Sequence, residues 1–303
     1  GTGSLTKAGA GAVTLTGNNS YSGGTIVSAG SLIGTTSSLQ GNINNYASIT
    51  FDQSTSGTYS QVMSGTGSLT KAGAGTVTLT GNNSYFGGAT VVDSGELNVN
   101  GSIASSEVTV NSGGSLSGSG TVGGISGAGS INPGNSPGIL TAPWIDPSDG
   151  MFLNFEITGI KPEYSLASGS VNDVLHLTSA SPITAAMTSA NQINVYFNMA
   201  SFDMTQAYLG GIYTDQQADF ASMVSGANFN YYVQDNAGTV SYNGVLYSAL
   251  SAGVTVSTVL DTANFADGTV NGRVMQFSIV PETSSALLVA CGTLFLLRRR
   301  RKS

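Results

Sequence analysis

GTGSLTKAGAGAVTLTGNNSYSGG, residues 1–24, returns almost unchanged as GTGSLTKAGAGTVTLTGNNSYFGG at residues 65–88. The two copies differ at two positions, Ala12/Thr76 and Ser22/Phe86. Self-similarity at a fixed spacing is the signature of a repeat architecture. Within each copy, short runs of Leu, Val and Thr alternate with Gly, Asn and Ser, which is typical of short strands joined by turns. The stretch therefore predicts an all-β protein with a repeated unit.

Composition favours order over disorder. Glycine supplies 42 of 303 residues and charged residues only 8%, against roughly 7% and 25% in ordinary chains. Disordered chains combine low hydrophobicity with high net charge, whereas 40% of this chain is hydrophobic and falls in strand-like runs. We expect ordered β-structure.

Charge is distributed unevenly along the chain. Five of the nine basic residues lie at residues 298–302, which leaves four basic against 16 acidic side chains in residues 1–297, a formal charge of −12. Such a body is not expected to bind nucleic acid or anionic lipid. Cys291 is the only cysteine, so no intramolecular disulfide forms. Position 1 is Gly and the chain opens within a repeat, so we expect a fragment whose start, including any signal peptide, is missing.

Strand-like triplets separated by Gly, Asn and Ser recur through residues 1–141 and suit a solenoid, in which each coil stacks on the next in parallel. The pairs Asn18–Asn19 and Asn82–Asn83 are expected in turns, where Asn tolerates left-handed backbone. Stacked coils could also align such residues into ladders.

The duplicated run, followed by TIVSAGSL at residues 25–32, resembles the passenger-associated repeat of autotransporter adhesins and related bacterial surface proteins. GSGTVGGISGAGSINPGNSPGILT, residues 118–141, is similar to the Gly-rich coil that closes such arrays. This resemblance implies a right-handed parallel β-helix over residues 1–142, with about seven coils of roughly 20 residues each.

Composition shifts after residue 142, where Pro143, Trp144, Pro147 and Gly150 interrupt the pattern. We expect a linker at residues 143–149 and a mainly β capping domain at residues 150–279, with longer alternating strands and one short helix at residues 215–224. Solenoids generally need such a cap over their last coil.

No catalytic, cofactor-binding or metal-binding residue is predicted. Lys7 and Lys71 recur at equivalent positions and are expected to be solvated at strand edges. Enzymes on β-helices need clustered carboxylates, whereas residues 1–142 contain no His or Arg and few acidic side chains, of which Asp93 and Glu96 are expected to solvate a turn. The four acidic residues are Asp52, Asp93, Glu96 and Glu107.

Two further groups of residues are candidates for a site. His176 is the only histidine, so it is expected to be packed or at the surface rather than catalytic. A set of aromatic residues is expected to serve as strand formers, with a sugar-stacking platform as the alternative. The set comprises Trp144, Tyr231, Tyr232, Tyr242 and Tyr247.

The last 24 residues, VPETSSALLVACGTLFLLRRRRKS, join a Pro-Glu pair, a 12-residue apolar run and a basic cluster. A 12-residue helix spans about 18 Å, short of the ~30 Å hydrocarbon layer. The order resembles the PEP-CTERM sorting signal of Gram-negative bacteria, which implies a short C-terminal hydrophobic helix, transient anchoring in the inner membrane and removal by an exosortase-like enzyme. Val280, Pro281 and Glu282 match that motif, while Thr283 replaces its second proline. The basic residues expected to stay cytoplasmic are Arg298, Arg299, Arg300, Arg301 and Lys302.

These features predict an exported, non-catalytic surface or extracellular-matrix protein, adhesin-like, membrane-anchored before processing and with exopolysaccharide as a partner. The alternative is a carbohydrate-active enzyme, a lyase or hydrolase, on the same scaffold. A cleft with two carboxylates would favour the enzyme.

Overall fold

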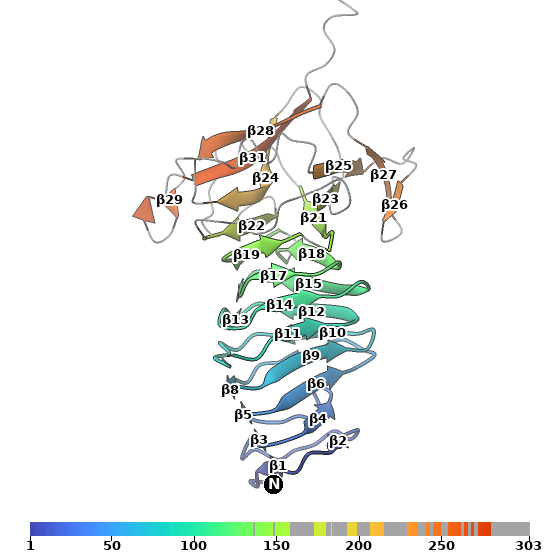
Figure 1. The fold of residues 1–303 in the computed structure, drawn as a ribbon, viewed down its shortest axis with the longest axis vertical. Coiled ribbons are helices and arrows are strands. Elements are labelled where there is room, and N and C mark those ends of the chain that lie inside the picture. The colour runs from blue at the N-terminus through green and yellow to red at the C-terminus, as the bar shows by residue number, and fades with distance from the viewer. Residues whose placement is uncertain are drawn as a thin grey trace, which may run out of the picture.

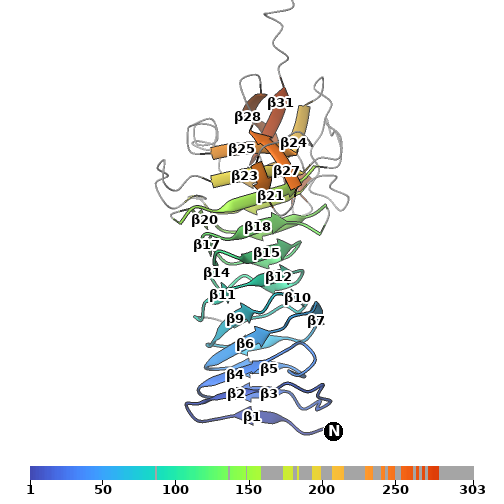
Figure 2. The same cartoon turned by 90° about the vertical axis from the view of Figure 1, so that its right-hand side faces the viewer.

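The computed structural model describes residues 1–85, 87–135, 137–147, 149–157, 173–179 and 183, together with the strands from β23 onward named below. Every regular element in these residues is a β-strand. The strands stack as successive layers of one column, with the N-terminus at one end (Figures 1 and 2).

Three strips of strands form the walls of the column. The first strip begins as sheet A, which contains β1 (Leu5–Lys7), β3 (Thr25–Val27), β5 (Ile43–Asn45) and β8 (Met63–Gly65). After an interval the strip resumes as sheet D, which contains β13 (Ser102–Ile103), β16 (Thr121–Val122), β19 (Ile139–Ala142), β22 (Val174–Leu177), β24 (Ala207–Thr214), β31 (Gly272–Ile279) and β28 (Val254–Asp261). Sheet B contains β2 (Ala12–Thr14), β4 (Ser31–Gly34), β6 (Ser48–Asp52), β9 (Ser68–Ala72), β11 (Thr90–Val92), β14 (Val108–Val110), β17 (Ile125–Ser126) and β20 (Ile145–Asp146). Sheet C contains β7 (Gly57–Tyr59), β10 (Thr76–Leu79), β12 (Gly95–Val99), β15 (Gly114–Gly118), β18 (Ser130–Pro133), β21 (Phe152–Glu156), β23 (Ile193–Asn198), β25 (Phe229–Gln234), β27 (Val245–Ala249) and β26 (Val240–Tyr242). A separate hairpin joins β29 (Asn264–Phe265) and β30 (Gly268–Thr269).

Pairing within sheet B is parallel throughout, and the chain advances by one coil between neighbouring strands. Ile49 pairs with Leu69, and Leu69 pairs with Thr90, so each coil takes about 20 residues, as predicted. The eight strands of this sheet are joined by seven turns of the chain. The predicted parallel β-solenoid is confirmed.

The core is a set of in-register columns of inward side chains. In sheet C, Leu97, Leu116 and Ile131 stack directly above one another and are fully or almost fully buried. Alternate residues of a strand point to opposite faces, so the period-2 pattern of each short run fills the column with one set and leaves the other set outside. A Leu-to-Ala change in such a column costs about 2–5 kcal/mol.

The residues shared by the two copies make hydrogen bonds both within a coil and between neighbouring coils. The hydroxyl of Tyr85 lies 2.7 Å from Thr90 Oγ1, and the equivalent Tyr21 hydroxyl lies 2.9 Å from Thr25 Oγ1. Asn83 is buried, accepts a hydrogen bond from Met63 N at 2.8 Å and donates one to the Gly81 carbonyl. Its backbone N–H donates to the Ser102 carbonyl at 2.8 Å, so Asn83 links sheet A to sheet D across the coil in which neither sheet has a strand.

Parallel pairing continues beyond residue 142. In sheet C, β21, β23 and β25 extend the ladder in parallel, as do β22 and β24 in sheet D. Antiparallel pairing begins only with β27 and β26 on one strip and with β31 and β28 on the other. The division into a repeat region, linker and cap stays a prediction, and the helices expected at residues 215–224 and within residues 280–303 lie outside the described residues.

Candidate functional site

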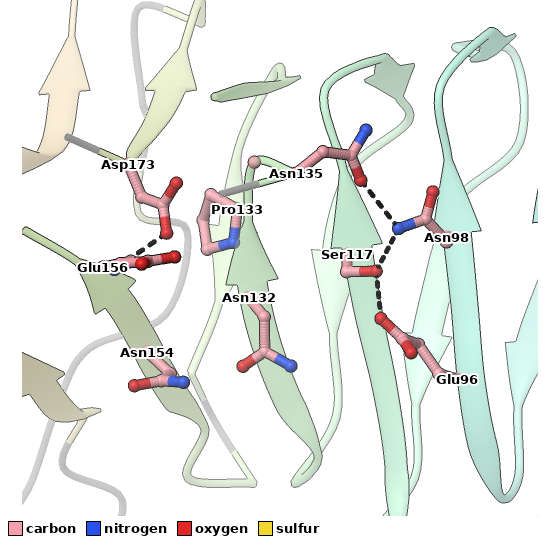
Figure 3. Close-up of a pocket in the computed structure, with 10 residues that line it drawn as sticks. Glu96, Asn98, Ser117, Asn132, Pro133, Asn135, Asn154, Glu156 and Asp173 are labelled. Carbon is pink, nitrogen blue, oxygen red and sulfur yellow. Dashed lines mark hydrogen bonds between the residues drawn. The ribbon is translucent and has the colours of Figure 1, made fainter. Parts of the chain in front are cut away.

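A polar hollow lies on the outer face of sheet C, where the repeat region meets the strands that follow it. Its volume is about 470 Å³. Strands β12, β15, β18 and β21 present its wall side by side (Figure 3). The lining residues are Glu96, Asn98, Ser117, Asn132, Pro133, Gly134, Asn135, Asn154, Glu156 and Asp173.

A ladder of small polar side chains runs through this wall. Asn98 pairs with Ser117 and Ser117 with Asn132, and Asn154 follows Leu153, the partner of Ile131. Stacking places these outward side chains in one row about 4.8 Å apart. Asn98 Nδ2 donates to Ser117 Oγ at 2.8 Å and to the side-chain oxygen of Asn135 at 2.9 Å.

Three amide oxygens in the row have no hydrogen-bond partner although they are shielded from water. These oxygens are Oδ1 of Asn98, Asn132 and Asn154. A buried polar atom without a partner costs about 1–3 kcal/mol. Such atoms are rare in folded proteins, and an ordered water or a ligand is a common reason for them.

Glu96 is held within the hollow and does not solvate a turn as predicted. Its carboxylate accepts hydrogen bonds from Thr76 Oγ1 at 2.9 Å and from Ser117 Oγ. Asp93 matches the prediction more closely, because it is exposed and accepts from Asn111 Nδ2 at 2.6 Å.

Asp173 clamps the far end of the hollow. One carboxylate oxygen accepts from Gly138 N at 2.9 Å. The other accepts from Glu156 N at 2.7 Å (Figure 3). Burial raises the pKa of this carboxyl to about 7 despite both hydrogen bonds, and the charge of Glu156 adds to the increase. Both oxygens are therefore committed to the backbone, while the Glu156 carboxylate accepts no hydrogen bond from a described residue.

The hollow is rich in acceptors and lacks cations. None of its lining residues is basic or aromatic, so an anionic ligand would meet up to three carboxylates with no compensating charge. In the part of the chain that the structure describes, no three His, Cys, Asp or Glu residues could hold a metal ion. The chemistry that fits is a ligand with several hydroxyl donors.

The two repeated lysines are buried, contrary to prediction. Lys71 has no exposed surface, and Nζ donates to the carbonyls of Ala72, Gly73 and Ser94 at 2.8, 2.7 and 3.0 Å. Lys7 is 5% exposed and donates to the carbonyls of Ala8, Gly9 and Ala29. Each ammonium closes the turn between two coils. Desolvation lowers the pKa of Lys71, although the negative charges of Asp52 and Glu96 act to raise it.

The aromatic candidates do not form one platform. Tyr231 faces the interior and stacks near Phe197, with ring centroids 6.3 Å apart, whereas Tyr232 stacks on Tyr196 at 4.7 Å outside. Parallel stacking covers the ring faces that a sugar would use. The indole of Trp144 lies where a side chain on Gly124 would have to fit, and the side chains of Tyr242 and Tyr247 lie outside the described residues.

The remaining candidates are dispersed or undescribed. His176 is half-buried on β22, where it pairs with Thr141 and Tyr213, away from the carboxylates of the hollow. Asp52 and Glu107 do not line the hollow either. The predicted sorting motif and basic cluster, residues 280–282 and 298–302, lie outside the described residues. No described helix has the length and apolar character required to cross a bilayer.

Comparison with known proteins bears on the duplicated stretch. A family model described as the passenger-associated-transport-repeat matches residues 5–33 and 69–99. The repeats are of the autotransporter type. The BmaC autotransporter adhesin of Brucella suis biovar 1 (strain 1330) is 50% identical over 62 residues, which cover 19% of this chain and 2% of that protein. The chain thus corresponds to a small part of that relative, and the matched segments lie almost wholly before the hollow.

Sequence reasoning missed the hollow because its carboxylates come from separate coils. Glu96, Glu156 and Asp173 are far apart in sequence, and only the stacking register brings them to one face. One signal was available: Asn98, Ser117, Asn132 and Asn154 occupy outward positions of the successive strands β12, β15, β18 and β21. A period-2 reading combined with the coil length would have aligned them.

Proposed function

We propose that this chain is part of an exported, adhesin-like surface protein of a Gram-negative bacterium, which acts by display and binding and not by turnover. The observation that carries the proposal is the autotransporter-type repeat, matched at residues 5–33 and 69–99 and folded as a parallel solenoid. Similarity to an autotransporter adhesin supports it. A right-handed winding is part of the same proposal.

The geometry of the hollow favours binding over glycoside hydrolysis. A glycosidase needs two carboxyl groups free to face the scissile bond, about 5–9.5 Å apart. Here both oxygens of Asp173 accept backbone N–H groups and Glu96 accepts two hydroxyls. That leaves Glu156 as the one lining carboxylate without such partners, which is poor material for an acid–base pair.

We also propose that residues 280–303 are a PEP-CTERM-like sorting signal, which an exosortase-like enzyme removes after transient anchoring in the inner membrane. The apolar run of residues 286–297 would span only about 18 Å as a helix, too short for a comfortable permanent span. Mass spectrometry of the mature protein should place its C-terminus near residues 280–283. Recovery of residues 298–303 on surface material would disprove the cleavage.

One experiment tests binding against catalysis. The full chain is assayed for retention on exopolysaccharide matrix, with and without calcium, beside a turnover assay on the same polymers. We expect retention without depolymerisation. Depolymerisation that is lost in Glu156→Gln would replace this proposal with the carbohydrate-active enzyme.

A further inference from the structure

We propose that the hollow between β12 and β21 binds an uncharged saccharide through its asparagine row. This inference deepens the proposed adhesive function and rests on it, because it names the site and the ligand chemistry. The volume of about 470 Å³ lies within the range of small-molecule sites, roughly 300–1,000 Å³.

The first argument is the imbalance of donors and acceptors. Oδ1 of Asn98, Asn132 and Asn154 are buried without a partner, and Glu156 adds a carboxylate that receives no hydrogen bond from a described residue. Saccharide hydroxyls supply donors at short intervals along a chain. The terminal torsion of Asn is broad, so the Asn154 amide, which bonds no described group, can rotate its oxygen toward a donor in the hollow.

The second argument is charge. Glu96, Glu156 and Asp173 line the hollow and no lysine or arginine does. The charges of Glu96 and Glu156, joined by Asp173 once the pH exceeds its pKa of about 7, would repel uronic acid, sulfate or phosphate groups. A neutral saccharide meets no such barrier, and its hydroxyls can donate to the carboxylate oxygens.

The third argument is that two of the three asparagines, Asn132 and Asn154, contribute little to holding the fold together. Asn154 makes no hydrogen bond with a described side chain or backbone group, and Asn132 makes one, from Nδ2 to Ser115 Oγ at 2.7 Å. By contrast, Asn83 and Asn45 make two or more hydrogen bonds each, all with groups of their own column. Both polar ends of Asn83 and Asn45 are thus bonded. In the hollow Asn98 also makes two hydrogen bonds through Nδ2, but Oδ1 of Asn98, Asn132 and Asn154 has no partner.

The test is calorimetric titration of the full chain with a panel of neutral oligosaccharides, including cellohexaose and maltohexaose, and with acidic hexagalacturonate. We expect at least one neutral probe to bind, and hexagalacturonate to bind at least tenfold more weakly. In Asn154→Leu and Asn132→Leu, affinity for the neutral probe should fall at least tenfold. Asn111→Leu is the matched control, because Asn111 is exposed and bonds only Asp93 and the backbone. The affinity of this variant for the neutral probe should equal that of the wild type.

Thermal unfolding separates a binding role from a structural one. Asn154→Leu should leave the melting temperature unchanged or raised, because it removes an unsatisfied oxygen. A lowered melting temperature with unaltered saccharide affinity would make the row structural and overturn the proposal. Failure of every neutral probe to bind, equal affinity for hexagalacturonate, or binding of calcium alone would also overturn it.

The site and the adhesive function can fail separately. If the chain adheres to matrix and Asn154→Leu adheres equally well, the site is wrong and adhesion stands. If neutral probes bind in the hollow but the chain does not adhere, the site stands and the proposed function is wrong.

Discussion

Replacing Lys71 by methionine tests whether the repeat signature includes a buried cation. Methionine keeps the apolar stem and much of the volume, so no large cavity forms. The loss is confined to the ammonium and its three hydrogen bonds, to the carbonyls of Ala72, Gly73 and Ser94. These are backbone groups that the substitution leaves behind, half-buried between coils.

The magnitude follows from those carbonyls. Each carbonyl left without a donor costs about 1–3 kcal/mol, so three would cost at least about 3 kcal/mol if water did not reach them. Relief from ammonium desolvation, the cause of the lowered Lys71 pKa, acts in the opposite direction. We therefore expect Lys71→Met to reduce the free energy of unfolding by about 3 kcal/mol.

Urea unfolding followed by far-ultraviolet circular dichroism measures this change, and Lys7→Met is the matched control. Lys7 makes the same three bonds, but the neighbouring Ala8 and Gly9 are exposed, so water can replace the ammonium there. Lys7→Met should cost less than half as much. A Lys71→Met protein within 0.5 kcal/mol of wild type, a margin typical of surface changes, would refute the reasoning.

Burial raises the Asp173 pKa from 3.8 to about 7. Between these two pH values the folded state keeps a proton that the unfolded state has released. The free energy of unfolding therefore falls as the pH rises from about 4 to about 7. Urea unfolding at pH 5 and pH 8 should show a smaller decline in Asp173→Asn than in wild type; equal declines would contradict the assignment. Leu79→Asp places an unpaired charge in a fully buried position and should abolish cooperative unfolding, whereas a dichroism spectrum and melting curve like wild type would count against the column. Gly65 has φ +106°, and a side chain there would meet the Asn45 carbonyl at 2.1 Å; Gly65→Ala should lower stability by more than 1 kcal/mol, and Gly9→Ala, whose added carbon meets nothing within 4 Å, should cost less.

The parallel solenoid could be predicted because every level of the sequence agrees on it. The duplicated stretch supplied the unit, the alternation supplied inward and outward faces, and Gly and Asn supplied turns. Leu69 and Thr90 pair within one coil length as expected. Short-range pattern is sufficient when each coil contacts mainly its neighbours.

The buried lysines could not be predicted from residue type. Lys is almost never buried unless it is paired. Here the partners are backbone carbonyls, and two neighbouring coils supply them. Ser94 lies 23 residues from Lys71, so the pairing exists only after stacking. The repetition of the lysine at equivalent positions was the available signal, because a merely solvated side chain has no reason to recur with its turn.

The hollow forms next to the place where the outward side chains of sheet C change from small polar residues to tyrosines. Between β12 and β21 the row is Asn and Ser, and beyond β21 it continues as Tyr196 and Tyr232, which stack on one another. The short Asn and Ser side chains leave a depression over these four strands, because the strand spacing is constant while the side-chain length is not, and no aromatic ring lines it. The same parallel register that carries the core past residue 142 therefore also creates the recess, and a binding site at this place requires no departure from the solenoid.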